Sequence, residues 1–453
     1  MPVAVSRPLG VRHRPEPLWR SREAFFTEAA LFVFGAAGLY SYNLIGALPG
    51  NEVLLLALLP VLLLARGGRA FESQYRRFYL VTGGWLLGTL ISDRYNAIPM
   101  FNSSKGIARV VFFVLDFMAL AIFLNRKTRR IVIFALSLAF VLIGSSLEFS
   151  GDFSIQWKFG VSQGLSILVL LGSSYLYAKQ KYRLCLLISV VLAGLNLNYG
   201  FRSQLGVHFV SAVLIMPLFA QSTRRPGTQS PMRILLLLTL ALGAAYAANA
   251  SIKYAARHNF FEESLNQKFL GQSEGDYGVL VGGRPETLVA IQAILDRPII
   301  GHGSFPFEMK YVQMKQDIQY EHGYSDSDVA EETDAPVIPT HSHLTLAWVE
   351  GGIFGGICWI YILILTIRGA LRLTSLRPPL APLYSYLLIS FLWDILYSPF
   401  GSVNRIRAAF YVLLSYTILA TPLPASARSL GAHIKVLTSS RRRPVRLVSR
   451  AAN

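Results

Sequence analysis

The chain has 453 residues, of which 53% are hydrophobic and 15% are charged, and its mean hydropathy is +0.43. A soluble chain carries about 25% charged residues, so this composition excludes an ordinary soluble protein and is typical of a chain dissolved in lipid. The net charge of +18 could suggest nucleic-acid binding. Most Lys and Arg residues, however, form short clusters between long apolar runs, and this distribution excludes nucleic acid as the expected partner.

Twelve apolar runs follow a basic N-terminus. Because many more runs follow the first one, we predict that the first run is a membrane anchor and not a cleaved signal peptide. They cover residues 26–47, 52–65, 78–92, 107–124, 131–147, 164–178, 184–199, 205–220, 234–250, 346–367, 383–397 and 405–422. Cys185 and Cys358 both fall inside these runs, which predicts buried thiols and neither a disulfide framework nor a thiolate metal site. We therefore predict an all-α, polytopic bundle of about twelve transmembrane helices.

The positions of the basic clusters predict the orientation of this bundle. With a cytoplasmic N-terminus, every second loop lies inside, and those loops hold the clusters around Arg66–Arg77, Arg126–Arg130, Lys179–Arg183, Arg224–Arg233 and Arg368–Arg377. The predicted segments are a cytoplasmic N-terminus (1–25), transmembrane helices one to nine (26–250), an outer loop (251–345), helices ten to twelve (346–422) and a basic cytoplasmic tail (423–453).

The outer loop, residues 251–345, carries 14 of the 25 acidic residues, 7 Lys or Arg residues and five of the eight histidines. Apolar spacing predicts one amphipathic helix between Pro285 and Pro298 and a second starting at Pro306, either on the membrane surface or against the bundle. Gly301-His302-Gly303 is predicted to form a tight turn, and the acidic stretch Ser325–Pro339 to be mobile.

Two arginines are candidate anion-binding residues. Arg202 lies at an outer membrane boundary, where an ionisable group usually has a partner or a substrate, although it could also be an Arg that extends to the interface and stabilises a helix end. Arg284 precedes Pro285, which places it at a helix N-terminus, where backbone N–H groups and a guanidinium both favour a phosphate. The alternative for Arg284 is a surface ion pair with Glu286.

His341 and Glu350 lie at the entrance of the tenth apolar run. A His at a membrane–water boundary can act as a general base, because its pKa is close to neutral. A zinc site that uses His341, His343 and carboxylates of the acidic stretch is a rival with a weak signal. Glycines after Glu350 are explained by close helix packing, whereas the carboxylate itself is costly in a membrane unless it is paired or lies at the water boundary.

These motifs together resemble the O-antigen ligase and polymerase superfamily. The resembling features are Arg284 with its helix, the turn Ile300-Gly301-His302-Gly303-Ser304-Phe305, and His341-Ser342 with Glu350-Gly351-Gly352 nine residues after the His. Ser342 stands where the family more often has Asn. Arg202-Ser203 is similar to a Ser-Arg-Gly motif of the family, with Phe201 and Ser203 departing from it.

The resemblance implies a metal-independent glycosyltransferase without cofactors in the bacterial inner membrane, with both termini cytoplasmic and the large loop periplasmic. Its donor would be a glycan on undecaprenyl diphosphate, and its acceptor a sugar hydroxyl of lipid A–core or of another lipid-linked saccharide. In that case Arg202 and Arg284 would stabilise the leaving diphosphate and His341 would orient or deprotonate the acceptor. We expect Gly301, Gly303, His343 and Glu350 to contact the substrate.

Other functions remain open at this point. Ligases and polymerases of the superfamily share these motifs, and the ligase is our first expectation by analogy. A secondary transporter also fits twelve helices, with Asp116 and Asp394 as the clearest carboxylates inside predicted helices. A non-catalytic partner in polysaccharide export is the third alternative.

Overall fold

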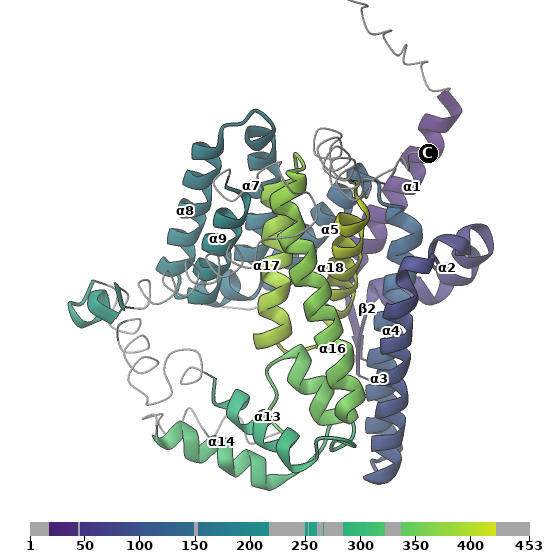
Figure 1. Ribbon diagram of the computed structural model, residues 1–453, viewed down its shortest axis with the longest axis vertical. Helices are drawn as coiled ribbons and strands as arrows, with labels where there is room; N and C mark the ends of the chain where they lie inside the picture. The colour runs from purple at the N-terminus through teal and green to yellow at the C-terminus, as the bar shows by residue number, and fades with distance from the viewer. Residues whose placement is uncertain are drawn as a thin grey trace, which may run out of the picture.

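The computed structural model describes residues 18–43, 46–148, 153–216, 250–251, 253–260, 266, 284–321 and 337–422. These residues form a mostly helical molecule, shown in Figure 1. Its first elements are α1 (Leu18–Ala36), η1 (Ala37–Leu39), β1 (Ser41–Asn43), β2 (Ala47–Pro49), α2 (Gly50–Arg66), η2 (Gly67–Arg69), η3 (Ser73–Tyr75), α3 (Arg76–Tyr95), α4 (Met100–Leu124) and α5 (Thr128–Ser146). Next come α6 (Phe153–Gln156), η4 (Trp157–Val161), α7 (Ser162–Ala178), α8 (Tyr182–Asn198) and α9 (Arg202–Ile215). The last are α13 (Pro285–Asp296), α14 (Met309–Glu321), α16 (His343–Leu376), α17 (Ala381–Tyr397) and α18 (Ser402–Ala420).

Five helical segments of the described chain are long and apolar enough to cross a membrane: Gly50–Arg69, Met100–Leu124, Thr128–Ser146, Phe153–Ala178 and His343–Leu376. Shorter apolar helices cover Ala24–Leu39, Tyr182–Asn198 and Ala381–Tyr397. Large apolar side chains also face outward, such as Leu64, which is 91% exposed, and Met100, which is 86% exposed. Such surfaces are stable against lipid rather than water, so the structure supports a membrane protein, while the count of twelve crossings stays a prediction.

The first predicted run, residues 26–47, differs from the structure at its C-terminal end. Helix α1 ends at Ala36, and after the short turn η1 the chain forms the antiparallel hairpin β1–β2, in which Tyr42 pairs with Leu48. Gly46 has a φ of +98° beside the hairpin turn, a conformation that glycine adopts most readily, and Pro49 precedes α2. Of the ninth run, residues 234–250, all but the last residue lie outside the described residues.

Helix α16 is central to the packing, because it contacts α3, α17, α18 and the loop helix α13. Aromatic rings fill the contact between α3, α4 and α16. Trp359 lies 6.0 Å from Trp85 and stacks on Phe113 with ring centroids 5.7 Å apart, and Phe400 closes the group at 5.0 Å from Trp359. These four side chains are at most 2% exposed, so this part of the bundle has a rigid aromatic core.

The loop helices α13 and α14 pack on each other and on the start of α16. Val289 and Ala293 of α13, Tyr311 of α14 and Val349 of α16 share a small buried cluster. Outside it, Asp296 accepts hydrogen bonds from Lys310 Nζ (2.6 Å) and the Tyr311 hydroxyl (2.7 Å), which lower the pKa of Asp296 to about 2. The prediction of the first loop helix is confirmed.

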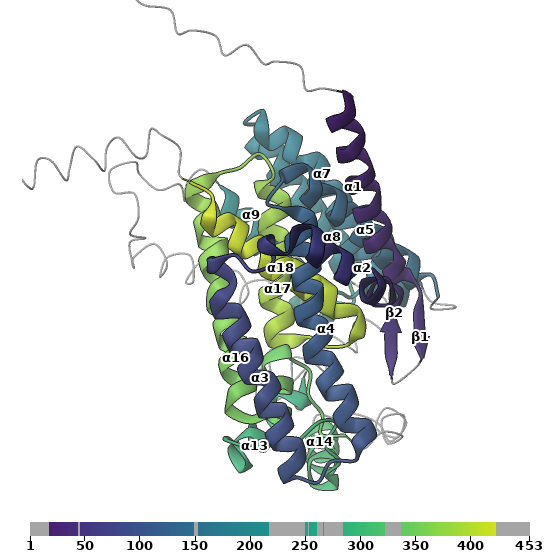
Figure 2. The same ribbon diagram turned by 90° about the vertical axis from the view of Figure 1, so that its right-hand side faces the viewer.

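The second loop helix begins at Met309, three residues later than predicted. Phe307 forms an isolated bridge with Val337 instead, and the Ile338 N–H donates to the carbonyl of Pro306 (2.9 Å). The residues Val337–Pro339 therefore hold a fixed position on the loop, while 325–336 of the stretch predicted to be mobile lie outside the described residues. Both views place α13 and α14 at the end of the molecule opposite to the start of α1 and the end of α18 (Figures 1 and 2).

Candidate active site

Arg284 is fixed at the junction of α13 and α17. It is the N-cap residue of α13, with Pro285 as the first helical residue, and its Nη1 donates a hydrogen bond to the Tyr397 carbonyl at the C-terminal end of α17. The guanidinium also lies 5.3 Å from the ring centroids of both Trp393 and Tyr397. A cation can satisfy the last carbonyl groups of a helix, and the faces of aromatic rings attract it as well. These contacts therefore hold the Arg284 side chain in place.

His341 is brought to the same end of α17 by its neighbour Ser342. The Ser342 hydroxyl donates to the Ile395 carbonyl (2.9 Å) and accepts from the Thr345 N–H (3.1 Å), which makes Ser342 the N-cap of α16. Serine is a preferred N-cap residue, because its side-chain oxygen satisfies a free N–H of the first turn. Two carbonyls two residues apart, at Ile395 and Tyr397, therefore hold Ser342 and Arg284 at one site.

Four charged groups surround His341, namely Glu286, Arg284, Lys315 and Lys158. Protein atoms crowd the imidazole even though the residue keeps an exposed surface, and this desolvation lowers the pKa of His341 below its ordinary value of 6.5. The Glu286 carboxylate raises the pKa, and the three cations lower it. His341 is consequently neutral at pH 7, which is the state a general base requires.

Arg284 does not form the surface ion pair with Glu286 that the sequence left open. The Glu286 carboxylate lies 3.3 Å from Lys315 Nζ of α14, and both side chains are largely buried. Glu286 nevertheless remains a charged neighbour of Arg284. Burial lowers the pKa of Arg284 below its ordinary value, and the Glu286 carboxylate opposes part of this shift. Arg284 and His341 thus share one electrostatic environment, although 57 positions separate them in the chain.

Arg202 starts α9, on the side of the bundle where η4 lies. The turn before it packs on η4, since Tyr199 lies 4.6 Å from Trp157, and the Trp157 indole N–H donates to Asn196 (3.1 Å). Lys158, the next residue of η4, is one of the charged neighbours of His341. The structure thus brings Arg284 and His341 together, whereas the place of Arg202 beside them stays a prediction.

Gly301 and Gly303 contact the helix break of α16. Gly352 has a φ of +62° and interrupts α16, which frees carbonyls for the loop: His302 N–H donates to Val349 (2.7 Å) and Gly303 N–H donates to Glu350 (3.1 Å). The φ values of Gly301 and Gly303 are +81° and +86°, and a Cβ atom on Gly301 would lie 2.6 Å from the Gly352 nitrogen. Close backbone approach explains these glycines, and their contact with a substrate stays a prediction.

His343 and Glu350 lie inside the protein. His343 is 1% exposed and packs between Trp359 and Phe400, with ring centroids 4.8 and 4.9 Å away. Glu350 forms an ion pair with Arg109 and accepts a hydrogen bond from the Phe305 N–H (3.2 Å). Of the two conditions that make a carboxylate tolerable at a membrane helix, pairing or a place at the water boundary, the structure shows pairing for Glu350. These contacts give both residues a structural role whatever their part in substrate binding.

Sequence patterns did not identify several residues of this site. Three separate helices contribute Lys158, Lys315, Trp393 and Tyr397. Nothing in the sequence around any of these four residues indicates more than a structural role. The i, i+4 spacing of Trp393 and Tyr397 is the signal that places them on one helix face. The carboxylates that could complete a zinc site with His341 lie within 325–336, outside the described residues.

No match to the chain was found among protein-family models or among curated proteins.

Proposed function

We propose that the chain is an inner-membrane glycosyltransferase of the O-antigen ligase type, which transfers a glycan from a polyprenyl-diphosphate donor to a sugar hydroxyl. The observation that supports it best is the meeting of Arg284 and His341 at the C-terminal end of α17. An arginine suited to a diphosphate and a neutral histidine suited to a hydroxyl stand together next to amphipathic loop helices. The proposal includes the orientation in which both termini are cytoplasmic and the loop helices α13 and α14 lie on the outer side of the membrane.

The proposed reaction is a displacement at the anomeric carbon of the donor. The acceptor hydroxyl oxygen forms the new bond to that carbon while its proton passes to the His341 imidazole. The bond between the anomeric carbon and the diphosphate oxygen breaks, and polyprenyl diphosphate leaves with the electron pair. Arg284 and the N-terminus of α13 stabilise the growing negative charge, and Arg202 is a further candidate for the diphosphate. A lipid-linked acceptor would make the same chemistry a polymerisation.

The test is transfer by the purified protein, supplied with a lipid-diphosphate glycan and candidate acceptors in EDTA. We expect Arg284→Ala to lower the rate by about 10²–10³ fold, the cost of one preorganised charge-stabilising donor. His341→Ala should lower it by about 10²–10⁴ fold, the usual contribution of a general base. Arg284→Lys should recover part of the loss, because it restores the charge without the bidentate geometry.

Matched controls come from the same region. Arg297→Ala removes an exposed arginine from the other end of α13, and His258→Ala removes an exposed histidine of the loop. Both variants should keep wild-type transfer. Full activity in Arg284→Ala or His341→Ala would remove that residue from the mechanism, and activity that is lost in EDTA and restored by zinc would contradict metal-independent transfer.

A transporter is the second candidate, and Asp116 is the observation that favours it. Asp116 is 0% exposed inside α4, and neither carboxylate oxygen has a hydrogen-bond partner among the described residues. Its charged neighbours are Glu52 and Arg405. Ionisable groups at such depth often belong to proton or ion pathways. Movement of the lipid-linked glycan across proteoliposomes without chemical change would favour this function over transfer.

A further inference from the structure

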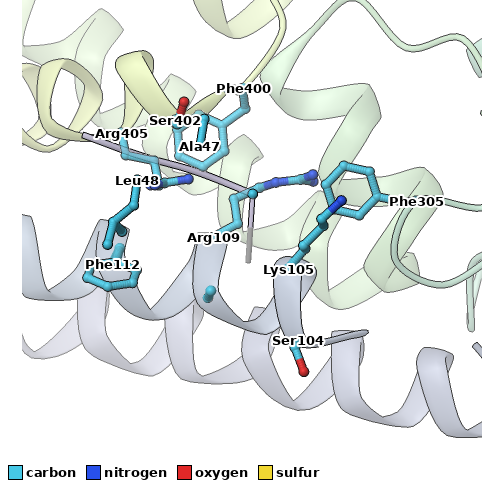
Figure 3. Close-up of a pocket in the computed structure, with 13 residues that line it drawn as sticks. Ala47, Leu48, Ser104, Lys105, Arg109, Phe112, Phe305, Phe400, Ser402 and Arg405 are labelled. Carbon is cyan, nitrogen blue, oxygen red and sulfur yellow. The ribbon is translucent and has the colours of Figure 1, made fainter. Parts of the chain in front are cut away.

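A second cationic site lies on the other side of the connection between α17 and α18. It is a cavity of about 450 Å³ between the β1–β2 hairpin, α4, Phe305 and the start of α18. Its volume falls in the range of ~300–1,000 Å³ that is usual for small-molecule sites. Figure 3 shows Lys105 and Arg109 extending from α4 toward the Phe305 ring, with Arg405 entering from α18. We infer that this cavity binds the phosphate headgroup of a membrane lipid.

The positive charge of the cavity is built into the bundle. Arg109 and Arg405 are 7% and 8% exposed, so neither is a freely moving surface side chain. A carboxylate holds each of them in place: Glu350 pairs with Arg109, and Glu52 accepts hydrogen bonds from Arg405 Nε and Nη2 at 2.6 and 2.5 Å. Guanidinium groups held in this way present their remaining surface to a ligand with little loss of side-chain entropy.

Lys105 supplies the charge that the protein does not neutralise. Its ammonium lies 4.3 Å from the centroid of Phe101 and 5.5 Å from that of Phe305, and within the described chain it forms no ion pair with a carboxylate. The lining of the cavity thus contains three cations and no carboxylate, since Glu52 and Glu350 pair with the two arginines from outside the lining. A partly buried ammonium among aromatic rings is stabilised by an anion, and phosphate is the anion that arginine and lysine recognise together.

The other walls of the cavity indicate a lipid source for the phosphate. Phe112, Phe400, Leu48 and Ala108 give an apolar lining beside the cations, and Arg405 itself lies 5.7 Å from the Phe112 ring centroid. The cavity is near the first turns of α4, an apolar helix of membrane-spanning length whose Met100 is exposed. An amphipathic ligand with a phosphate and an attached apolar chain satisfies both kinds of wall.

This cavity is distinct from the proposed active site. Its lining contains none of Arg202, Arg284 and His341. Different residues at the end of α17 and the start of α18 serve the two sites, because Tyr397 holds Arg284 whereas Phe400 and Ser402 line the cavity. Lipid binding here does not depend on the proposed transfer reaction and would persist if that reaction were absent.

Native mass spectrometry of the delipidated protein tests the inference with three probes: dioleoyl phosphatidic acid, dioleoylglycerol and glycerol 3-phosphate. We expect phosphatidic acid to bind more tightly than either of the other two. Lys105→Gln should weaken that binding about tenfold, the loss expected when a charge-assisted contact is removed. Ala108→Phe, which fills the cavity without changing a charge, should weaken it as well.

Lys179→Gln is the matched control, since Lys179 also lies over an aromatic ring, Tyr175, but is the C-cap of α7 and does not line the cavity. It should bind phosphatidic acid like the wild type. Equal loss in this control, unchanged binding in both cavity variants, or equal affinity for dioleoylglycerol would overturn the inference. Equal affinity for glycerol 3-phosphate would overturn the lipid source. Thermal unfolding of each variant in detergent identifies any that fail to fold, and Lys105→Arg should then retain binding.

Discussion

Backbone carbonyl groups, more than other side chains, hold the residues of the proposed active site in position. Carbonyls at the end of α17 receive Arg284 and Ser342, so His341 is oriented by the residue next to it. Ser342 stands where the superfamily that the motifs resemble more often has Asn, and in the structure the Ser342 hydroxyl both caps α16 and binds α17. A short hydroxyl side chain can thus serve as the anchor at this position.

The charges around His341 predict the pH dependence of transfer. Because His341 must be neutral to accept a proton and its pKa is lowered, the acidic limb of kcat/KM should lie below pH 6.5. Glu286→Gln removes the carboxylate that raises this pKa and leaves Lys315 unpaired, so the limb should move to lower pH. Lys315→Gln removes a cation that lowers it, so the limb should move to higher pH. The measurement is the pH–rate profile of each variant.

The control for these profiles is Lys310→Gln, on the same helix as Lys315 but paired with Asp296. Its acidic limb should match that of the wild type. A limb above pH 6.5 in the wild type, or shifts of the same sign in Glu286→Gln and Lys315→Gln, would show that another group controls the reaction.

At the scale of elements, the break in α16 connects the loop that carries α13 and α14 to the bundle. The loop turn at Gly301–Gly303 occupies the carbonyls that the break exposes, and Ile353 N–H donates back to Ile299 (3.0 Å). A periodicity of apolar residues predicts where α16 runs, but it does not reveal that the helix is interrupted. The glycines at 351 and 352 indicated close packing in the sequence, whereas the structure assigns Gly352 a backbone conformation that is essentially restricted to glycine.

Substitution of Gly352 tests the importance of this break. A Cβ atom there would lie 2.1 Å from the Ile299 carbonyl oxygen, and φ is positive, so Gly352→Ala should destabilise the protein by about 1–3 kcal/mol. Gly172→Ala is the matched control, because a Cβ atom at this helical position meets nothing within 4 Å. It should leave stability unchanged or raise it slightly. Thermal unfolding in detergent provides the comparison, and equal stability of the two variants would mean that the break relaxes easily.

At the scale of the whole molecule, the apolar runs predicted the positions of most described helices, since long apolar segments in lipid have few alternatives to a helix. The β1–β2 hairpin was missed, because its residues extend an apolar run and only Gly46 and Pro49 mark the change. For the candidate site, the sequence identified Arg284 and His341 by motif. It could not identify Lys158, Lys315 or the receiving carbonyls, because their proximity depends on how distant helices pack.

The two cationic sites divide the region around the end of α17 and the start of α18 in a way that the sequence did not indicate. One adjoins His341 and the loop helices, and the other is enclosed by α4 and α18. Both touch the connection between α17 and α18, with Tyr397 on one side and Phe400 on the other. Ligand binding at either site therefore has a short structural connection to the other.

The most direct test of the proposed activity follows both products of a donor labelled separately in its glycan and in its polyprenyl diphosphate. With the purified wild-type protein in EDTA, we expect equal amounts of polyprenyl diphosphate and of glycan joined to the acceptor hydroxyl. Release of free glycan, cleavage between the two phosphates, or a donor that stays intact under conditions where the protein is folded would contradict it.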